Sequence, residues 1–175
     1  NVIMITLLDT TLRDGEQTSG VSFAKQEKMA IARLLLEDLR VDRIEVASAR
    51  VSDGEFETVR NIARWAAQNG YEDKVEVLGF VDGQVSLEWV KNAGVKVMNL
   101  LCKGSHKHCT MQLGKKPEEH IADITQVVTL AHEWGVGINV YLEDWSNGMK
   151  NSPDYVFALV DALRSLPIRR FMLPD

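Results

Sequence analysis

The chain has 175 residues, with 20 Lys and Arg against 25 Asp and Glu, for a formal net charge of −5. This length supports one compact domain with a sizeable core, and the acidic balance argues against a nucleic-acid backbone binder, which presents a basic surface. Cys102 and Cys109 form no CxxC motif, and the N-terminal apolar run is too short for a signal peptide or a membrane span, so we expect a soluble cytoplasmic protein with no nucleic-acid or membrane partner.

Short apolar runs alternate with longer amphipathic segments along the chain. Mostly continuous apolar runs are typical of parallel strands that are covered on both faces. The expected strands, in chain order, are Ile3–Leu8, Arg43–Ala47, Val75–Phe80, Val95–Leu101, Ile138–Glu143 and Arg169–Leu173.

A helix is expected between each pair of consecutive strands. Apolar residues at helical spacing mark the first two helices, and a proline favoured in the first turn begins the last two. The expected helices are one striped by Ile31, Leu35 and Leu39, one striped by Phe56, Val59, Ala63 and Ala66 and followed by Gly70, one over Leu87–Ala93, one from Pro117 to Gly135, and one from Pro153 with Ser152 as its N-cap.

Strict alternation of strands and helices predicts an α/β fold with a parallel sheet and right-handed crossovers. Two architectures compete, an open doubly wound sheet of six strands and a (β/α)8 TIM barrel of about 250 residues. Charged residues follow the carboxyl ends of several strands, which a barrel gathers on one rim, and no glycine-rich phosphate loop follows the first strand. We therefore favour a barrel with about six βα units present, truncated before strand 7.

The dipeptide Arg13-Asp14 follows the first expected strand. A carboxylate is a hard oxygen ligand for Mg²⁺, Mn²⁺ or Zn²⁺, and an adjacent guanidinium supplies fixed positive charge. Together they suit chemistry in which a metal polarises a carbonyl and an arginine stabilises an oxyanion. The alternative is a surface Arg–Asp pair that only caps a loop.

Two further carboxylates lie in or at the end of apolar strands. Glu45 interrupts "RIEVAS", where a buried charge needs a partner, and a salt bridge to Arg13 would supply one. Glu143 ends "INVYLE", where it could accept a hydrogen bond from a ligand. The alternatives are a solvent-facing Glu45 and a Glu143 that only leads into the next helix.

The segment "GSHKHC" places His106 and His108 at a spacing that would suit a metal site on a strand. Because the segment lies in a loop flanked by lysines, neither histidine is assigned as a metal ligand. Cys102 is expected to be a small buried hydrophobic residue. The Asp-Trp pair in "LEDWSNG" is expected to form a turn and not an active site by itself.

The segment "LLDTTLRDGEQTSGVSF" resembles the opening signature of the DRE-TIM metallolyases, the family of 2-isopropylmalate, homocitrate and citramalate synthases and 3-hydroxy-3-methylglutaryl-CoA lyase. The resemblance continues through "VDRIEVASARVSDGE", "VEVLGFVDG", "NLLCKGSHKHC", "INVYLEDWSNG" and "FMLPD". These segments look most like the citramalate synthase branch.

The resemblance implies a TIM-barrel enzyme that condenses acetyl-CoA with a 2-oxo acid and needs a divalent metal (Mn, Mg or Zn). It implies that Asp14 is a metal ligand and that Arg13 stabilises the enolate or oxyanion, with Glu45 holding Arg13. It implies that Glu143 contacts the bound 2-oxo acid. The complete protein is expected to be a homodimer with C-terminal regulatory segments.

Leu78, Leu101 and Tyr141 match positions that line the small apolar pocket of citramalate synthases. Bulky side chains there leave room for the methyl group of pyruvate but crowd an isopropyl group, a discrimination of about 1–3 kcal/mol per carbon. We therefore expect pyruvate as the acid and citramalate as the product. The alternatives are 2-isopropylmalate synthesis from 2-oxoisovalerate, a related acyl-CoA lyase, and a catalytically dead half-barrel that acts as an interaction module.

The family completes its metal site with a His-x-His motif on strand 7, and the sequence stops at Asp175, before that strand. Residues 1–175 are therefore expected to form a partial catalytic domain with strands 1–6, without strands 7 and 8 or a C-terminal regulatory region. We expect the isolated chain to bind divalent metal weakly and to have no synthase activity.

Overall fold

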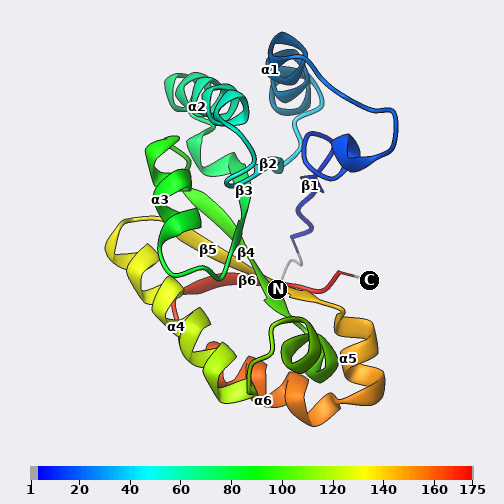
Figure 1. The fold of residues 1–175 in the computed structure, drawn as a ribbon. Helices are drawn as coiled ribbons and strands as arrows, with labels where there is room; N and C mark the ends of the chain where they lie inside the picture. Colours follow the sequence, from blue (N-terminus) through cyan, green and yellow to red (C-terminus); the bar gives the residue numbers. More distant parts are fainter. Residues whose placement is uncertain (1–3, 175) are drawn as a thin grey trace. The chain divides into compact units, whose positions relative to one another are not determined.

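The computed structural model describes residues 4–174, which fold into two compact units of parallel strands and helices (Figure 1). The first unit runs to Leu78 and also contains Trp89–Val97. The second unit contains Gly79–Glu88 and the chain from Met98 onward. The third strand and the third helix each have residues in both units.

Three strands follow one another in the sheet of the first unit. β1 pairs with β2, and β2 pairs with β3, both in parallel. Two main helices, α1 and α2, pack beside each other. The elements are β1 (Leu8–Asp9), α1 (Lys25–Arg33), a π-helical turn (Leu34–Asp38), β2 (Arg43–Ser48), α2 (Asp53–Gln68) and β3 (Val75–Phe80).

The sequence accounts for α2 at both of its ends. The Ser52 hydroxyl accepts a hydrogen bond from the Glu55 N–H at 3.1 Å, which satisfies a donor that the first turn would leave unpaired. Val59 and Ala66, on the apolar stripe, have no exposed surface. Gly70 takes φ of +76° just beyond the helix, a conformation in which glycine commonly ends helices.

The second unit contains the end of β3 and continues with β4, β5 and β6 as successive neighbours. β5 and β6 pair in parallel, and α4 packs against β5 and beside α6 (Figure 1). The elements are α3 (Val85–Asn92, whose second half belongs to the first unit), β4 (Val97–Lys103), a π-helical turn (His108–Gln112), α4 (Pro117–Glu133), β5 (Gly137–Glu143), α5 (Trp145–Asn151), α6 (Pro153–Leu163) and β6 (Ile168–Met172).

Two glycines allow backbone to pack on backbone where β4 ends. The Gly104 N–H donates a hydrogen bond to the Glu143 carbonyl at 2.6 Å. A Cβ on Gly104 would lie 2.5 Å from the Leu142 carbonyl oxygen, and a Cβ on Gly148 would overlap the Gly104 carbonyl. Neither position has room for a side chain.

The predicted α/β class is confirmed, because parallel strands joined by helices stand next to their neighbours in chain order. That order belongs to a partial TIM barrel, whereas a doubly wound sheet reverses its strand order. The strands predicted at Val75–Phe80 and Ile138–Glu143 are found at those positions within one residue. None of the helices among residues 4–174 combines the length and apolar composition needed to cross a bilayer.

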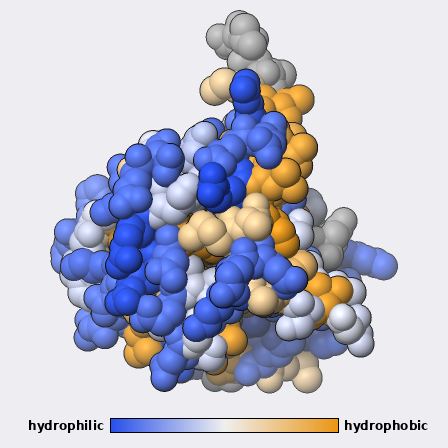
Figure 2. All heavy atoms as spheres, turned by 90° about the horizontal axis from the view of Figure 1, so that it is seen from above, coloured by the Kyte–Doolittle hydropathy of each residue, from blue (hydrophilic) through white to orange (hydrophobic). Residues whose placement is uncertain are grey.

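The predicted first strand, Ile3–Leu8, is wrong over most of its length. Pairing with β2 begins only at Leu8, and Met4, Ile5 and Leu7 are 84%, 80% and 62% exposed. Figure 2 shows apolar surface, in orange, on one face of the molecule among mainly hydrophilic side chains. An apolar run is buried only where a neighbouring element covers it. Apart from the Arg43 N–H, which donates to the Leu7 carbonyl at 3.1 Å, no described strand pairs with residues 4–7. Ile3 lies outside the described residues.

Two smaller predictions are also wrong, one of them only in part. Leu39 is 64% exposed, because the π-helical turn before it holds an extra residue per turn and takes Leu39 out of line with Leu35. The turn predicted at the Asp144-Trp145 pair is confirmed at Asp144, which takes φ of +65°, and is wrong at Trp145, which begins α5.

Candidate active site

A tight turn after β1 presents Arg13 and Asp14. The backbone N–H groups of both residues donate to the Thr10 carbonyl, at 3.1 and 2.8 Å. The Asp9 carboxylate accepts hydrogen bonds from the Thr11 N–H at 2.9 Å and from the Thr11 hydroxyl at 3.1 Å. Asp9 therefore shapes the turn, an established use of aspartate after a strand.

Arg13 is held by a buried carboxylate from the next strand. Its Nε donates to Glu45 Oε1 at 2.6 Å, and the Glu45 side chain has no exposed surface. Arg13 Nη1 also donates to Asp14 Oδ1 at 3.1 Å. The structure thus brings together the three charged residues that the sequence singled out in this unit, and it joins Arg13 to Glu45 as an ion pair.

A second buried ion pair lies beside the first. Glu76 on β3 stands opposite Glu45 on β2 in the parallel register, and its side chain is also fully buried. Arg43 Nη1 donates to both Glu76 carboxylate oxygens at 3.1 Å. Two neighbouring buried carboxylates repel each other unless each has a cation, so the Arg43 pair supports the charge on Glu45.

The loop that carries Arg13 is anchored through a buried lysine, which sequence reasoning missed. Lys28 on α1 is 2% exposed, and its Nζ lies 2.6 Å from Glu55 Oε1 on α2. The same ammonium pairs with Glu16, whose other carboxylate oxygen accepts the Phe23 N–H at 3.1 Å. Glu16 therefore ties the loop to both helices.

A cavity of about 190 Å³ opens beside Arg13 in the first unit. Its wall combines the Arg13 guanidinium with the carboxylates of Glu16 and Glu55, and the remaining lining is uncharged. The lining residues are Leu12, Arg13, Glu16, Gln17, Ala47, Ser48, Val51 and Glu55.

Of the three charged residues Arg13, Asp14 and Glu45, only Asp14 has an exposed carboxylate that could bind a metal. Its side chain is 63% exposed, and only its Oδ1 is engaged by Arg13. Within residues 4–174, no three His, Cys, Asp or Glu side chains gather as a metal site. The donor set fits one position in the shell of a hard divalent cation and does not complete that shell.

Glu143, at the end of β5, forms an ion pair with Lys103 at the end of β4. The carboxylate is 37% exposed. Because side chains alternate along a strand, Leu101 lies on the same face of β4 as Lys103, and Tyr141 lies on the same face of β5 as Glu143. Leu101 and Tyr141 are both partly exposed there.

Asn99 on β4 and Asn139 on β5 lie on the same faces of these strands as Lys103 and Glu143. Asn139 Nδ2 donates to Asn99 Oδ1 at 2.9 Å, and both side chains are buried, so this face also has polar groups in its interior. Sequence reasoning identified Glu143 but missed its lysine partner. Leu78, the third predicted pocket residue, belongs to the first unit and is 6% exposed.

The two histidines of "GSHKHC" contact different partners. The His106 ring packs edge-on against Tyr155, and His108 Nε2 lies 3.4 Å from Asp144 Oδ2. Cys102 is fully buried, as predicted.

A histidine that the sequence did not single out supports the Lys103 backbone. His120 Nε2 accepts a hydrogen bond from the Lys103 N–H at 3.0 Å. The His120 side chain is buried, and burial lowers its pKa from 6.5 to about 4. The ring is therefore neutral at physiological pH, as the accepted hydrogen bond requires.

A family model and individual relatives assign this chain to the same protein family. Residues 4–175 match the HMGL-like family. A 2-isopropylmalate synthase of Acidovorax ebreus is 32% identical over 97% of this chain, which covers 32% of that protein. A Methanopyrus kandleri protein assigned to the (R)-citramalate synthases is 31% identical over 90% of this chain, which covers 29% of that protein.

A third relative, an Ignicoccus hospitalis protein assigned to the 2-isopropylmalate synthases, is 32% identical over 98% of this chain, which spans 41% of that protein. The chain therefore spans less than half the length of these curated relatives.

Solved structures share the fold. An HMG-CoA lyase of Bacillus subtilis superposes with a TM-score of 0.73 at 20% identity, over 98% of this chain and 58% of that one. A Pseudomonas aeruginosa hydroxymethylglutaryl-CoA lyase gives a TM-score of 0.73 at 17% identity, over 98% and 57% of the two chains.

Proposed function

Because this chain belongs to the HMGL-like family, we propose that it supplies part of the catalytic barrel of an enzyme that condenses acetyl-CoA with a 2-oxo acid. The observation that carries the proposal is the Arg13–Glu45 pair. A guanidinium fixed by a fully buried carboxylate borders a cavity at the carboxyl ends of β1 and β2, where barrel enzymes carry their active sites.

Arg13 would stabilise negative charge that develops on oxygen during the condensation. Removing the proton from the acetyl methyl group gives an enolate, and attack on the keto carbon gives an alkoxide. A preorganised donor lowers the energy of both without reorienting as the charge forms. Glu45 acts through Arg13 by fixing its position.

Asp14 would hold a divalent cation, which supplies Lewis-acid polarisation of the keto group when it is bound. The exposed, half-engaged carboxylate supports this role. In the second unit, Glu143 would contact the 2-oxo acid, with Lys103 keeping the carboxylate in place.

Pyruvate is the proposed acid, because Leu78, Leu101 and Tyr141 would leave room for a methyl group and crowd larger substituents. A second acid, 2-oxoisovalerate, is favoured by the relatives assigned as 2-isopropylmalate synthases. The first assignment leads to citramalate in isoleucine biosynthesis, and the second leads to leucine biosynthesis.

Cleavage instead of condensation would make the protein an acyl-CoA lyase. The solved HMG-CoA lyases resemble this chain at about 20% identity, which establishes a shared fold. A half-barrel without catalysis would have no need for two buried ion pairs beside an exposed Asp14. We further propose that the complete protein is a cytoplasmic homodimer.

The first test is thiol release from acetyl-CoA by the complete gene product, with Mn²⁺ or Mg²⁺ and with pyruvate and 2-oxoisovalerate in parallel. Release with pyruvate far above release with 2-oxoisovalerate supports citramalate synthesis. A preference for 2-oxoisovalerate would still support condensation but would refute the proposed roles of Leu78, Leu101 and Tyr141 in the substrate pocket. Arg13→Lys should abolish most of the release, while Arg60→Lys, in an exposed pair on α2, should leave it unchanged.

If neither acid gave thiol release, the result would count against condensation. Product analysis with hydroxyacyl-CoA thioesters would then test the lyase direction. The isolated chain of residues 1–175 is expected to show weak metal binding and no release.

A further inference from the structure

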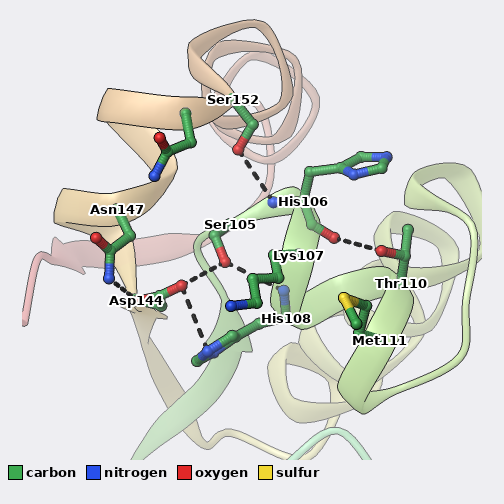
Figure 3. A pocket seen from close by; sticks show the side chains of 10 residues that line it. Ser105, His106, Lys107, His108, Thr110, Met111, Asp144, Asn147 and Ser152 are labelled. Atoms are coloured by element: carbon green, nitrogen blue, oxygen red, sulfur yellow. Dashed lines mark hydrogen bonds and ion pairs between the residues drawn. The ribbon is translucent and has the colours of Figure 1, made fainter.

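A second cavity, of about 450 Å³, lies in the second unit where β4 and β5 end (Figure 3). It is built from the segment "GSHKHC", which the proposed condensation does not use, and from α5. We call it the β4–β5 pocket, and Ser105, Lys107, His108, Asp144, Asn147 and Asn151 are the lining residues that matter here.

Asp144 is the sole carboxylate in the lining of this pocket, and its oxygens are already engaged. Oδ2 accepts the Ser105 hydroxyl at 2.7 Å and lies 3.4 Å from His108 Nε2. Oδ1 accepts the Asn147 amide at 2.7 Å. The hydrogen bonds from Ser105 and Asn147 hold the pKa of Asp144 below its ordinary value, so the carboxylate stays ionised as a structural acceptor.

Lys107 is the cation of the pocket. Its side chain is exposed, and its ammonium has no hydrogen-bond or ion-pair partner within the part of the chain described. In Figure 3 it extends to the side of the pocket that holds His108 and Asp144, and its charge contributes to the lowered pKa of Asp144. Asn151 adds a neutral amide to the lining.

We propose that the β4–β5 pocket binds a phosphate group, with the Lys107 ammonium as its charge partner and the Asn151 side-chain amide as a further donor. An ammonium is a common phosphate binder. Asp144 already accepts hydrogen bonds from Ser105 and Asn147, so the donors left to a phosphate are the Lys107 ammonium and the Asn151 amide.

Two sources could supply the phosphate. One is the phosphorylated nucleotide end of the acyl-CoA, which rests on the proposed function. The other is a free phosphate ester unrelated to the condensation. Both present the same chemistry to Lys107, and they differ in whether the nucleotide end of coenzyme A must be present for binding.

The test is calorimetric titration of the complete protein with coenzyme A, dephospho-coenzyme A, pantetheine and inorganic phosphate as separate probes. Lys107→Ala should weaken the phosphate-bearing probes about tenfold and leave pantetheine unchanged. Lys116→Ala, an exposed lysine of the same unit outside the pocket, is the matched control. Asp144→Asn should strengthen phosphate binding several-fold, because it removes the negative charge beside Lys107.

Opposite responses to Lys107→Ala and Asp144→Asn establish an anion site. Loss of coenzyme A binding alone assigns the coenzyme as the source, and loss of inorganic phosphate binding as well assigns a general phosphate site. Failure of every phosphate probe to bind, or equal affinity in wild type and Lys107→Ala, overturns the proposal. Because the readout is binding, these outcomes do not depend on whether the protein catalyses condensation.

Discussion

Arg13 Nε and Glu45 Oε1 lie 2.6 Å apart, and the carboxylate has no solvent-exposed surface. The pair joins the loop after β1 to the middle of β2. A buried charge that has lost its partner is strongly destabilising, so the two residues depend on each other. The Arg13 side chain is still 16% exposed, which leaves part of it available to a ligand.

Glu45→Gln tests whether Glu45 acts by fixing the position of Arg13. The amide keeps the shape but loses the charge, so Arg13 is held less firmly, and we expect kcat/KM for thiol release to fall by about tenfold to a hundredfold. Unfolding in urea should show a loss of about 3 kcal/mol. Glu57→Gln, in an exposed pair with Arg60, should change neither quantity; an equal effect of both variants would remove Glu45 from the positioning role.

Lys28→Met should destabilise the protein by about 3–5 kcal/mol, because it leaves Glu16 and Glu55 without their buried cation. The loop between β1 and α1 should then exchange its amide hydrogens faster. Lys25→Met is the control on the same helix, since Lys25 is exposed. Unchanged exchange in the loop of the Lys28 variant would show that Glu16 does not anchor it.

Stability should fall as the pH drops from 6.5 to 4, in part through His120. Burial lowers the pKa of His120 to about 4 in the folded protein. Between pH 6.5 and 4, His120 is therefore mostly protonated in the unfolded chain and mostly neutral in the folded protein. The contribution is fully present above pH 6.5 and is lost as the pH falls toward 4, by about 2 kcal/mol after allowance for solvent screening.

Urea unfolding at several pH values measures this dependence. His120→Gln should flatten the curve between pH 6.5 and 4, because glutamine can accept the Lys103 hydrogen bond without titrating. His132→Gln, at an exposed position on the same helix, should leave the curve as in wild type. Identical curves for all three proteins would refute the assignment.

Leu101→Ala should shift acid preference. Shortening this partly exposed side chain would make room beside the keto carbon, and the ratio of kcat/KM for 2-oxoisovalerate to that for pyruvate should rise about tenfold. Leu39→Ala, at an exposed position in the first unit, is the control. A ratio that does not move would exclude Leu101 from the substrate pocket.

Much of this fold could be predicted, because the spacing of apolar residues along the sequence indicates which side chains are buried. Val59 and Ala66 on α2 and the apolar runs of β3 and β5 were recognisable from spacing alone. The run before β1 was misjudged, because apolar character does not reveal whether a neighbour covers a strand. The α5 helix was missed, because Asn147, Gly148 and Asn151 have low helix propensity and tertiary packing overrides it.

Two patterns made part of the candidate site predictable. Arg13, Asp14 and Glu143 stood out at the ends of expected strands, and Glu45 stood out because a charge interrupted an apolar strand. Lys28 carried a comparable signal, since it shares the buried stripe of its helix with Ala32 and Leu35. The pairing of Lys103 with Glu143 gave no such signal, because it depends on how two distant strands are placed in the sheet.

The contact between Gly104 and Gly148 limits how this protein can be varied. Peptide groups from the end of β4 and from α5 touch with no side chain between them, so neither position can accept even alanine without displacing backbone. A mutant library that diversifies the β4–β5 pocket should therefore keep both glycines fixed and place its variation at Lys107, His108 and Asn147. Selection from such a library would test new ligands while the backbone around Gly104 and Gly148 keeps its conformation.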